Sequence, residues 1–339
     1  MGRRLRVACG YVGAVVGAGF ASGREIAHFF ARFGAWGLLG ALAAGGAFAW
    51  VGAAVLRLAA AEGWRDYGKA LRGLCGARWG GRLDAAVTAF LVVATATVLA
   101  GASAWAGRAG VPRWQGALAL AAALLATRAV GRRGPPVANQ ALVPLCTAVA
   151  LLAMGRGLHS TPTGRLLAAP GVVGSAVLWL PSAVLYVSYN LVLGLAGLLA
   201  AWQPEDGPDA ATGAAWGGLW LGGLAAASAA ALVPLGRDPE RVELPLAHAL
   251  ATDALGSWAY GLCLLAALWT TGNAALEALA RRFPAWPGWV VWGVGLAAAS
   301  PLAAQGLGWL VAVVYPALGY AGLPLLAAVA FRACRGPLD

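Results

Sequence analysis

The sequence predicts an all-α, polytopic membrane protein with about ten transmembrane helices in two sets of five. Of the 339 residues, 60% are hydrophobic and only 11% are charged, a composition typical of a membrane-spanning chain. Apolar runs of roughly 20 residues, the length needed to cross a bilayer, recur along the chain. The first and the sixth of these runs carry residues that interrupt an apolar helix, so both are predicted to be discontinuous.

The predicted spans are runs that are long enough, or nearly long enough, to cross a bilayer. They cover residues 5–30, 34–61, 83–107, 114–130, 138–158, 170–201, 213–235, 254–280, 286–303 and 305–331. We treat residues 1–339 as a single transmembrane domain, with a first repeat over 5–158 and a second over 170–331. Because each set holds an odd number of spans, the second repeat is predicted to be inverted relative to the first.

The net charge of +11 is explained by topology, because the arginines fall in the loops between apolar runs. Most Lys and Arg residues lie on the side that also holds both termini, which places the termini in the cytoplasm. The lipid bilayer is therefore the expected partner and nucleic acid is not. The cysteines and histidines are scattered singly, so no metal cluster or bound cofactor is expected beyond a coupling ion. The oligomeric state is left open.

The first span contains a glycine-rich stretch at residues 16–25. Glycine is a poor residue for a helix interior, and a break at membrane depth exposes backbone groups that must line a cavity or be buried in protein. We interpret the stretch as the broken middle of a helix that binds a solute. The candidate solute-binding residues here are Gly17, Gly19, Phe20, Ser22 and Gly23. The alternative is a packing face of small residues between helices.

Three ionisable residues follow directly, Arg24, Glu25 and His28. Such side chains are costly at membrane depth and indicate function, so we assign them to a gate or to ion coupling. Arg24 and Glu25 can pair as an outer gate, Arg24 can meet a solute carboxylate, and Glu25 or His28 can carry a proton. Alternatively, Arg24 and Glu25 extend to the membrane interface.

The sixth span carries polar side chains within an apolar run, at Tyr186, Ser188, Tyr189 and Asn190. Burying these groups in lipid is unfavourable unless they face a polar cavity or another helix. We assign them to the solute site, with Phe20 or Tyr189 as an apolar gate. The alternative for Asn190 is an interhelical hydrogen bond that serves packing.

The eighth span carries Thr270 and Thr271. Hydroxyl and carbonyl oxygens suit alkali cations, although threonine hydroxyls also bond back to the preceding helical turn. Outside the spans, residues 56–82 are expected to form an interfacial amphipathic stretch. Residues 236–253 are expected to form either a lid over an outer vestibule or a solvated loop.

The residues from Tyr11 to Ile26 resemble the opening of the bacterial YkvI-like membrane proteins. Residues 186–190 and 270–272 also look like the sixth and eighth spans of that family. Arg24 is a departure, since Gln often precedes the Glu there. The group is similar to the amino acid–polyamine–organocation superfamily, whose members share the LeuT-type inverted repeat of five plus five spans.

This resemblance implies a sodium site and a solute site. Carbonyls at Gly13 and Val16, with the hydroxyls of Thr270 and Thr271, would hold Na⁺, and amides near Gly17 and Gly19 would meet a solute carboxylate. Phe20 stands where some members have Asn, which counts against a second sodium site.

The expected function is secondary active transport of a small solute, an amino acid or a related zwitterion, in the bacterial cytoplasmic membrane. Coupling to sodium is favoured over coupling to protons. Alternatives are a channel and a non-transporting structural or signalling protein. An enzyme is not expected, because the spans lack HExxH, GxSxG and paired Asp residues.

Overall fold

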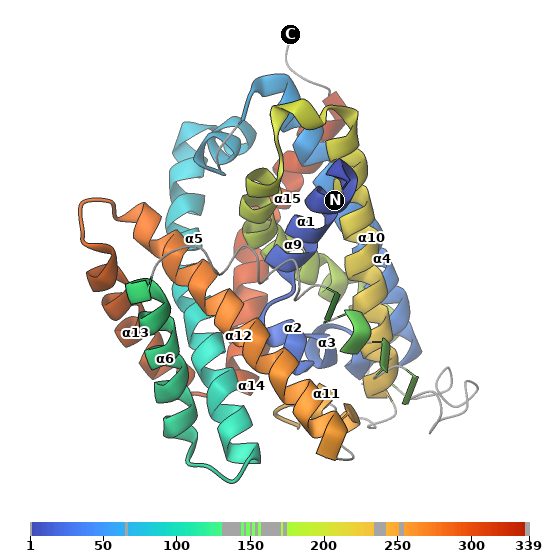
Figure 1. Cartoon of the computed structure of the whole chain (residues 1–339). Coiled ribbons are helices and arrows are strands. Elements are labelled where there is room, and N and C mark those ends of the chain that lie inside the picture. The colour runs from blue at the N-terminus through green and yellow to red at the C-terminus, as the bar shows by residue number, and fades with distance from the viewer. Residues whose placement is uncertain are drawn as a thin grey trace.

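Figure 1 shows the computed structural model of the chain. The structure describes residues 2–64, 67–130, 144–145, 147–149, 151–152, 155–156, 171, 175–233, 242–250 and 254–335. Every regular element within these residues is a helix, in agreement with the predicted all-α class.

The longest helices are α4 (Ala35–Glu62), α5 (Tyr67–Arg108), α9 (Ser175–Ala201), α10 (Pro208–Leu232) and α12 (Ala254–Arg282). The others are α1 (Arg3–Val15), α2 (Ala18–Ser22), α3 (Arg24–Phe29), α6 (Arg113–Val130), α11 (Pro245–Leu250), α13 (Gly288–Ala303), α14 (Leu307–Trp309) and α15 (Tyr315–Arg335). Three short elements are also present, namely the 3-10 helices η1 (Ala31–Phe33) and η2 (Pro204–Asp206) and a π-helical turn (Leu310–Val314), and the described residues within 144–156 are helical as well.

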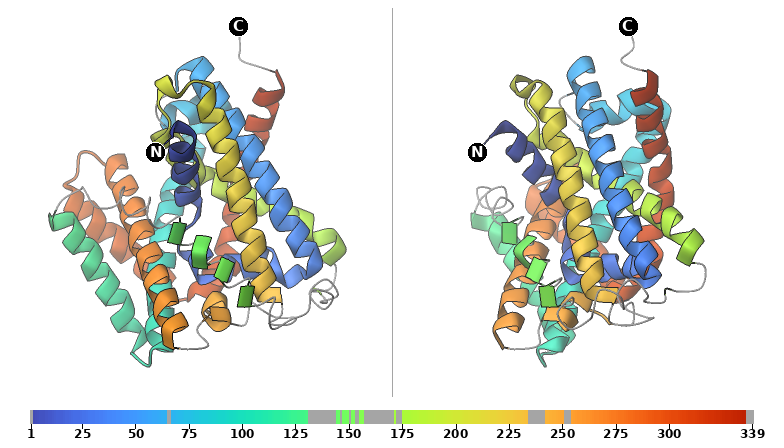
Figure 2. Two further views of the ribbon diagram at one scale, coloured as in Figure 1. Left: turned by 45° about the vertical axis from the view of Figure 1, so that its right-hand side comes forward. Right: turned by 90° about the vertical axis from the view of Figure 1, so that its right-hand side faces the viewer.

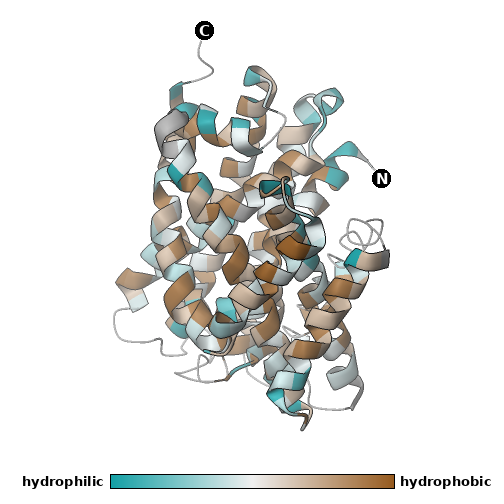
Figure 3. Cartoon of the chain, turned by 90° about the vertical axis from the view of Figure 1, so that its left-hand side faces the viewer, coloured by the Kyte–Doolittle hydropathy of each residue, from teal (hydrophilic) through white to brown (hydrophobic). Residues whose placement is uncertain are grey.

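The described chain is a polytopic helical membrane protein. Six of its helical stretches are long and apolar enough to cross a bilayer. Figure 3 shows hydrophobic residues along the middle of the helices, with many of the hydrophilic ones near the two ends of the bundle. Large apolar side chains such as Trp258, Leu262 and Trp289 are well exposed, as lipid contact requires. The predicted fifth span, 138–158, lies largely outside the described residues, so the count of about ten spans stays a prediction.

Helices that occupy corresponding places in the two predicted sets lie against each other. The pairs are α1 with α9, α4 with α10, α5 with α12, and α6 with α13. In Figure 2, α4 and α10 run side by side along the bundle. Gly45 meets the backbone of Gly222, and seven residues further along α4 Gly52 meets Ala214, so these two helices are antiparallel. The antiparallel orientation of α4 and α10 is compatible with the predicted inverted repeat.

The first span is discontinuous, as predicted. Helix α1 ends at Val15, and Val16 and Gly17 have extended backbone before α2 begins. A second interruption follows at Gly23, whose φ of 80° is left-handed and therefore favours glycine. Figure 1 places these breaks deep inside the bundle, about midway along it.

The predicted discontinuity of the sixth span is wrong. Helix α9 runs without a break from Ser175 to Ala201, even though Pro181 lies near its start. The polar residues that suggested a break have hydrogen-bond partners, and the helix that carries them is regular. The side-chain amide of Asn190 donates to the carbonyl of Tyr186 one turn earlier, at 3.0 Å, and the hydroxyl of Ser188 donates to the carbonyl of Gly319 on α15, at 2.7 Å. Polar side chains with such partners do not interrupt the backbone ladder.

Two other regions of the described helices are irregular. Residues 56–82, predicted to form an interfacial stretch, contain the end of α4 at Glu62 and the start of α5 at Tyr67, with a sharp bend at Gly76. Trp64 between the two helices is buried and packs on Gly73. In the last span the irregular region is the π-helical turn that ends just before Tyr315 and Pro316.

Candidate functional site

The break after α1 leaves backbone carbonyls without helical partners. The amide of Val16 still donates to Val12, at 2.8 Å, and the amide of Ala21 donates to Gly17, at 2.9 Å. Between these two bonds, within the described chain, no backbone amide donates across the break to the carbonyl of Gly13 or of Val16. Carbonyl groups at the end of a helix receive no hydrogen bond from an amide of that helix, so these oxygens can bind an external ligand.

A large cavity reaches this break. Its volume is about 450 Å³, and it extends from Arg6 and Ala201, near the N-terminal end of α1, to Thr271. The wall comes from α1, α5, α9 and α12, and small residues make up most of it: Cys9, Gly10, Gly13, Ala14, Leu91, Ala94, Ala196, Gly197, Ala200, Thr270, Ala274, Ala275 and Ala278 complete the lining. Alanine and glycine on all four helices leave the space unfilled. Of the predicted cation-binding residues, Gly13, Thr270 and Thr271 share this wall.

The eighth-span threonines lie where the cavity meets the break. A Cβ atom placed on Gly17 would lie 3.5 Å from the side-chain oxygen of Thr271, so the Thr271 side chain faces Gly17 across the space that the missing side chain leaves. Thr270 donates its hydroxyl hydrogen to the carbonyl of Ala267, at 3.1 Å. A hydroxyl that donates in this way keeps its oxygen lone pairs for another ligand. Val16 is buried beside this region and does not line the cavity.

Glu25 is the buried acid of the site. Its side chain is 4% exposed, and Oε2 accepts a hydrogen bond of 2.8 Å from the hydroxyl of Tyr189 on α9. A Cβ atom on Gly19 would overlap Oε1 of Glu25. The carboxylate therefore rests on the backbone of α2, in the space that the absence of a side chain at Gly19 leaves open. The structure thus brings Gly19, Glu25 and Tyr189 together.

Aromatic rings surround the Tyr189 side chain. Its ring centroid lies 5.1 Å from that of Tyr315, 5.4 Å from Phe29, 5.5 Å from Tyr186 and 6.3 Å from Phe90. The rings come from α3, α5, α9 and α15, so this aromatic cluster joins both predicted repeats. Phe20 on α2 is also buried, but its ring contacts no other aromatic ring among the described residues.

Several residues that were predicted to bind the solute form hydrogen bonds with other groups of the protein. The hydroxyl of Ser22 donates to the carbonyl of Gly19, at 2.7 Å, and accepts from the amide of Arg24, at 3.1 Å. These bonds stabilise the turn at Gly23. Ser188 and Asn190 bond to backbone carbonyls, as described above. Ser188 therefore bonds to another helix, whereas Ser22 and Asn190 bond to carbonyls of their own segments.

The end of the bundle opposite the N-terminus is covered by residues 242–250, the described part of the segment predicted to be a lid or a loop, which include α11. The α11 residue Leu246 lies against the backbone of Gly23, and the carbonyl of Val242 accepts a hydrogen bond of 2.9 Å from Arg24. Arg113 at the start of α6 makes two bonds, of 2.7 and 2.8 Å, to the carboxylate of Glu243. This contact raises the pKa of Arg113, so the pair stays charged.

The three ionisable residues after the break have separate environments. Arg24 reaches Val242 and packs on Gly308 of α14, whereas Glu25 points to Tyr189. His28 is buried, with its ring 5.0 Å from that of Phe29 in an edge-on arrangement. The hydrogen-bond partners of Arg24 and Glu25 therefore lie on different elements, Arg24 bonding to the lid and Glu25 to α9.

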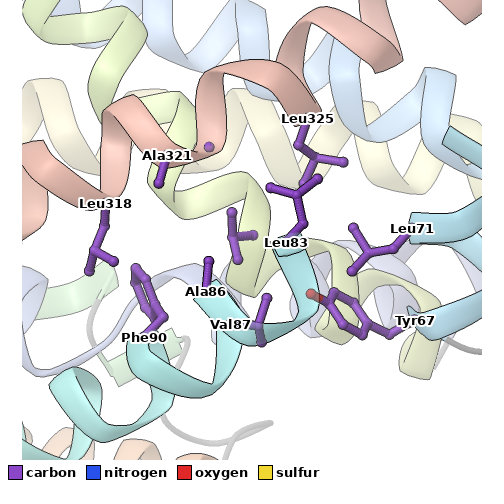
Figure 4. A pocket seen from close by; sticks show the side chains of 11 residues that line it. Tyr67, Leu71, Leu83, Ala86, Val87, Phe90, Leu318, Ala321 and Leu325 are labelled. Carbon is purple, nitrogen blue, oxygen red and sulfur yellow. The ribbon is translucent and has the colours of Figure 1, made fainter. Parts of the chain in front are cut away.

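A second, much smaller cavity of about 10 Å³ lies between α5 and α15. Figure 4 shows the side chains that line it, nearly all of them apolar, with Tyr67 at one end. Its size leaves room for a single water molecule at most. We therefore place the candidate site at the break and at the larger cavity.

Sequence reasoning missed the partners that α5 and α15 supply. The hydroxyl of Tyr315 donates to Thr97 Oγ1, at 3.1 Å, and the ring of Phe90 lies parallel to that of Tyr189. The polar residues of the third span and Tyr315 beside Pro316 were visible signals. Nothing in the sequence indicated that these residues meet the first and sixth spans.

The chain is similar in sequence to a bacterial membrane protein. The chain is 28% identical over 334 residues to the uncharacterized membrane protein YkvI of Bacillus subtilis (strain 168), a match that covers 97% of this chain and 95% of that protein. The chain is a homologue of YkvI. This relation confirms the resemblance to YkvI-like membrane proteins. No family model matches the chain.

The homology to YkvI covers almost the whole chain, so the break, the cavity wall and the aromatic cluster all lie within the related region or at its edges. The name of YkvI places that protein in a membrane, which agrees with the helical architecture described above.

Proposed function

We propose that this protein is a secondary active transporter that moves a small solute, an amino acid or a related zwitterion, by alternating access. The observation that carries the proposal is that the first span is interrupted, and that a cavity of about 450 Å³ ends at this interruption. Irregular backbone at membrane depth is tolerated where it is buried in protein or lines a cavity, and transporters place their solute sites at such breaks.

The arrangement of the helices supports a LeuT-type inverted repeat. Corresponding helices of the two sets are in contact, and α4 and α10 are antiparallel. The continuous α9 departs from that pattern, because only the first span is broken. In this protein the break alone would supply free backbone groups, and α9 would supply side chains such as Tyr189.

A sodium ion is the proposed coupling ion. The residues that would hold it are Gly13 and Val16, through their carbonyls, with Thr270 and Thr271, through their hydroxyls. All four offer hard oxygen ligands, and in the described chain neither carbonyl accepts a backbone hydrogen bond across the break. Bound there, the ion would supply positive charge between α1 and α12. It would favour one access state only to the extent that its affinity differs between the two.

A specific observation also supports proton coupling. Glu25 is a buried acid that accepts a hydrogen bond from the hydroxyl of Tyr189. Intramembrane acids commonly carry protons in pumps and transporters. Proton coupling through Glu25 is therefore the second candidate mechanism.

The proposal is tested by uptake into proteoliposomes, with a sodium or a proton gradient imposed separately and a panel of radiolabelled amino acids. We expect accumulation of at least one amino acid under a sodium gradient, together with exchange of labelled for unlabelled solute. Thr271→Val removes one oxygen while keeping the side-chain shape. It should raise the sodium concentration needed for half-maximal uptake by at least about tenfold.

Thr212→Val is the matched control, because Thr212 is half-buried near the start of α10, does not line the cavity, and bonds only to the carbonyl of Pro208 in the described chain. It should transport as the unmodified protein does. Failure of either gradient to drive accumulation of any amino acid would contradict the transporter proposal. Flux that never saturates and shows no exchange would indicate a channel instead.

A further inference from the structure

The carboxylate of Glu25 fills the space over Gly19. This is the part of the break whose amides were expected to meet a solute carboxylate. Oε1 lies where a Cβ atom of Gly19 would be, and Oε2 is bonded to the Tyr189 hydroxyl. The helix that would present those amides, α2, has only five residues. A solute carboxylate at this place would meet a carboxylate of the protein.

The surroundings of Glu25 suit a cation. Tyr189 lies among the rings of Phe29, Tyr186, Tyr315 and Phe90, at centroid distances from 5.1 to 6.3 Å. The faces of such rings attract ammonium groups within about 6 Å. The neighbouring Arg24 bonds to the carbonyl of Val242, away from this cluster. None of the ion pairs between described residues includes Glu25.

A buried carboxylate without a cation is unfavourable, and the arrival of a positive group offsets part of that cost. A second carboxylate would add repulsion in surroundings where charges are poorly screened. The balance at this place therefore favours a positively charged group over a negatively charged one.

We propose that Glu25, with the aromatic cluster around Tyr189, binds the ammonium group of the transported solute. The site then takes organic amines and zwitterions through their ammonium end and does not take solutes that carry only a carboxylate. This inference rests on the proposed transport function and narrows the class of its substrates.

The test uses matched solutes that differ only in their charged groups. One set is leucine, 3-methylbutylamine and 4-methylpentanoate; a second is phenylalanine, 2-phenylethylamine and 3-phenylpropanoate; a third is alanine, ethylamine and propanoate. Binding of each compound to purified protein is followed by thermal shift, since a ligand of the folded state raises its apparent stability. We expect the zwitterion or the amine of at least one set to bind and the carboxylate of that set to bind at least about 30-fold more weakly.

Glu25→Gln should weaken binding of the amine or zwitterion by at least about 30-fold, because one partner of a buried charge pair is removed. Glu205→Gln is the matched control, because Glu205 lies exposed on η2 and the substitution changes the net charge equally. It should leave binding unchanged. The ranking of solutes in the unmodified protein tests the inference even if Glu25→Gln does not fold.

A carboxylate that binds as tightly as its zwitterion, with an amine that does not bind, would overturn the inference and leave the transport proposal intact. Equal affinity in Glu25→Gln and the unmodified protein would also overturn it. If no compound binds and no amino acid is taken up in proteoliposomes, the transport proposal itself fails.

Discussion

Replacing Gly222 by valine is expected to prevent the protein from reaching a stable folded state. A Cβ atom at this position would lie 3.1 Å from the backbone nitrogen of Gly45 and even closer to its Cα. Both contacts are with main-chain atoms of α4, which cannot rotate away, so α4 and α10 would have to separate. We expect a loss of more than about 4 kcal/mol, which is comparable to the total stability of many proteins. Yield of monodisperse protein and the apparent unfolding temperature measure the effect.

The next residue supplies the control. Gly223 on the same helix is exposed, and a Cβ atom there would meet nothing within 4 Å. Gly223→Val is therefore expected to fold as the unmodified protein does. On α4, Gly45→Val and Gly46→Val should repeat the contrast, since Gly46 is also open. Equal behaviour of the two members of either pair would show that α4 and α10 do not approach as closely as described.

Replacing Gly19 by alanine is expected to abolish uptake while the protein still folds. The added methyl group would overlap Oε1 of Glu25 and lie 2.6 Å from its carboxyl carbon. The Glu25 side chain can rotate, so the helices need not move, but its bond to Tyr189 would be lost. Loss of a buried bond to a charged group costs about 1–3 kcal/mol. We expect uptake to fall by at least about 30-fold.

A double-mutant cycle isolates this contact. In protein that carries Glu25→Ala, the space over Gly19 is empty and the methyl group of Gly19→Ala has room. The cost of Gly19→Ala, measured as a shift in unfolding temperature, should therefore largely disappear in the Glu25→Ala background. An equal cost in both backgrounds would show that Glu25 does not rest on Gly19.

Glycine residues predicted an interrupted span correctly, whereas polar side chains did not. Gly17 and Gly23 predicted the interruptions of the first span because the backbone itself departs from a helix at these positions. Ser188 and Asn190 wrongly predicted an interruption of the sixth. A polar side chain in an apolar run needs a hydrogen-bond partner, and a carbonyl one turn away or on a neighbouring helix serves as well as a cavity does.

The main features of the site depend on contacts between distant parts of the chain. Glu25 and Tyr189 were both flagged as costly in lipid, but their hydrogen bond joins residues 164 positions apart. The cavity was not predictable, since it arises where alanine and glycine from four helices coincide. The place of Thr271 beside Gly17 was expected only through the family resemblance.

The transport proposal requires that the interrupted first span faces a water-filled solute pathway. It is tested most directly by the reactivity of a single cysteine at Ala274, which lines the large cavity on α12. The five native cysteines are first replaced by serine or alanine. Leu262→Cys on the outer face of the same helix, where Leu262 is 64% exposed, is the control that meets lipid.

A charged methanethiosulfonate reagent reacts with thiolate, which forms in water and not in lipid. We predict that Ala274→Cys reacts at least about tenfold faster than Leu262→Cys, and that the solute taken up best slows this reaction. Equal rates at the two positions, with no effect of any transported solute, would contradict a pathway that ends at the break.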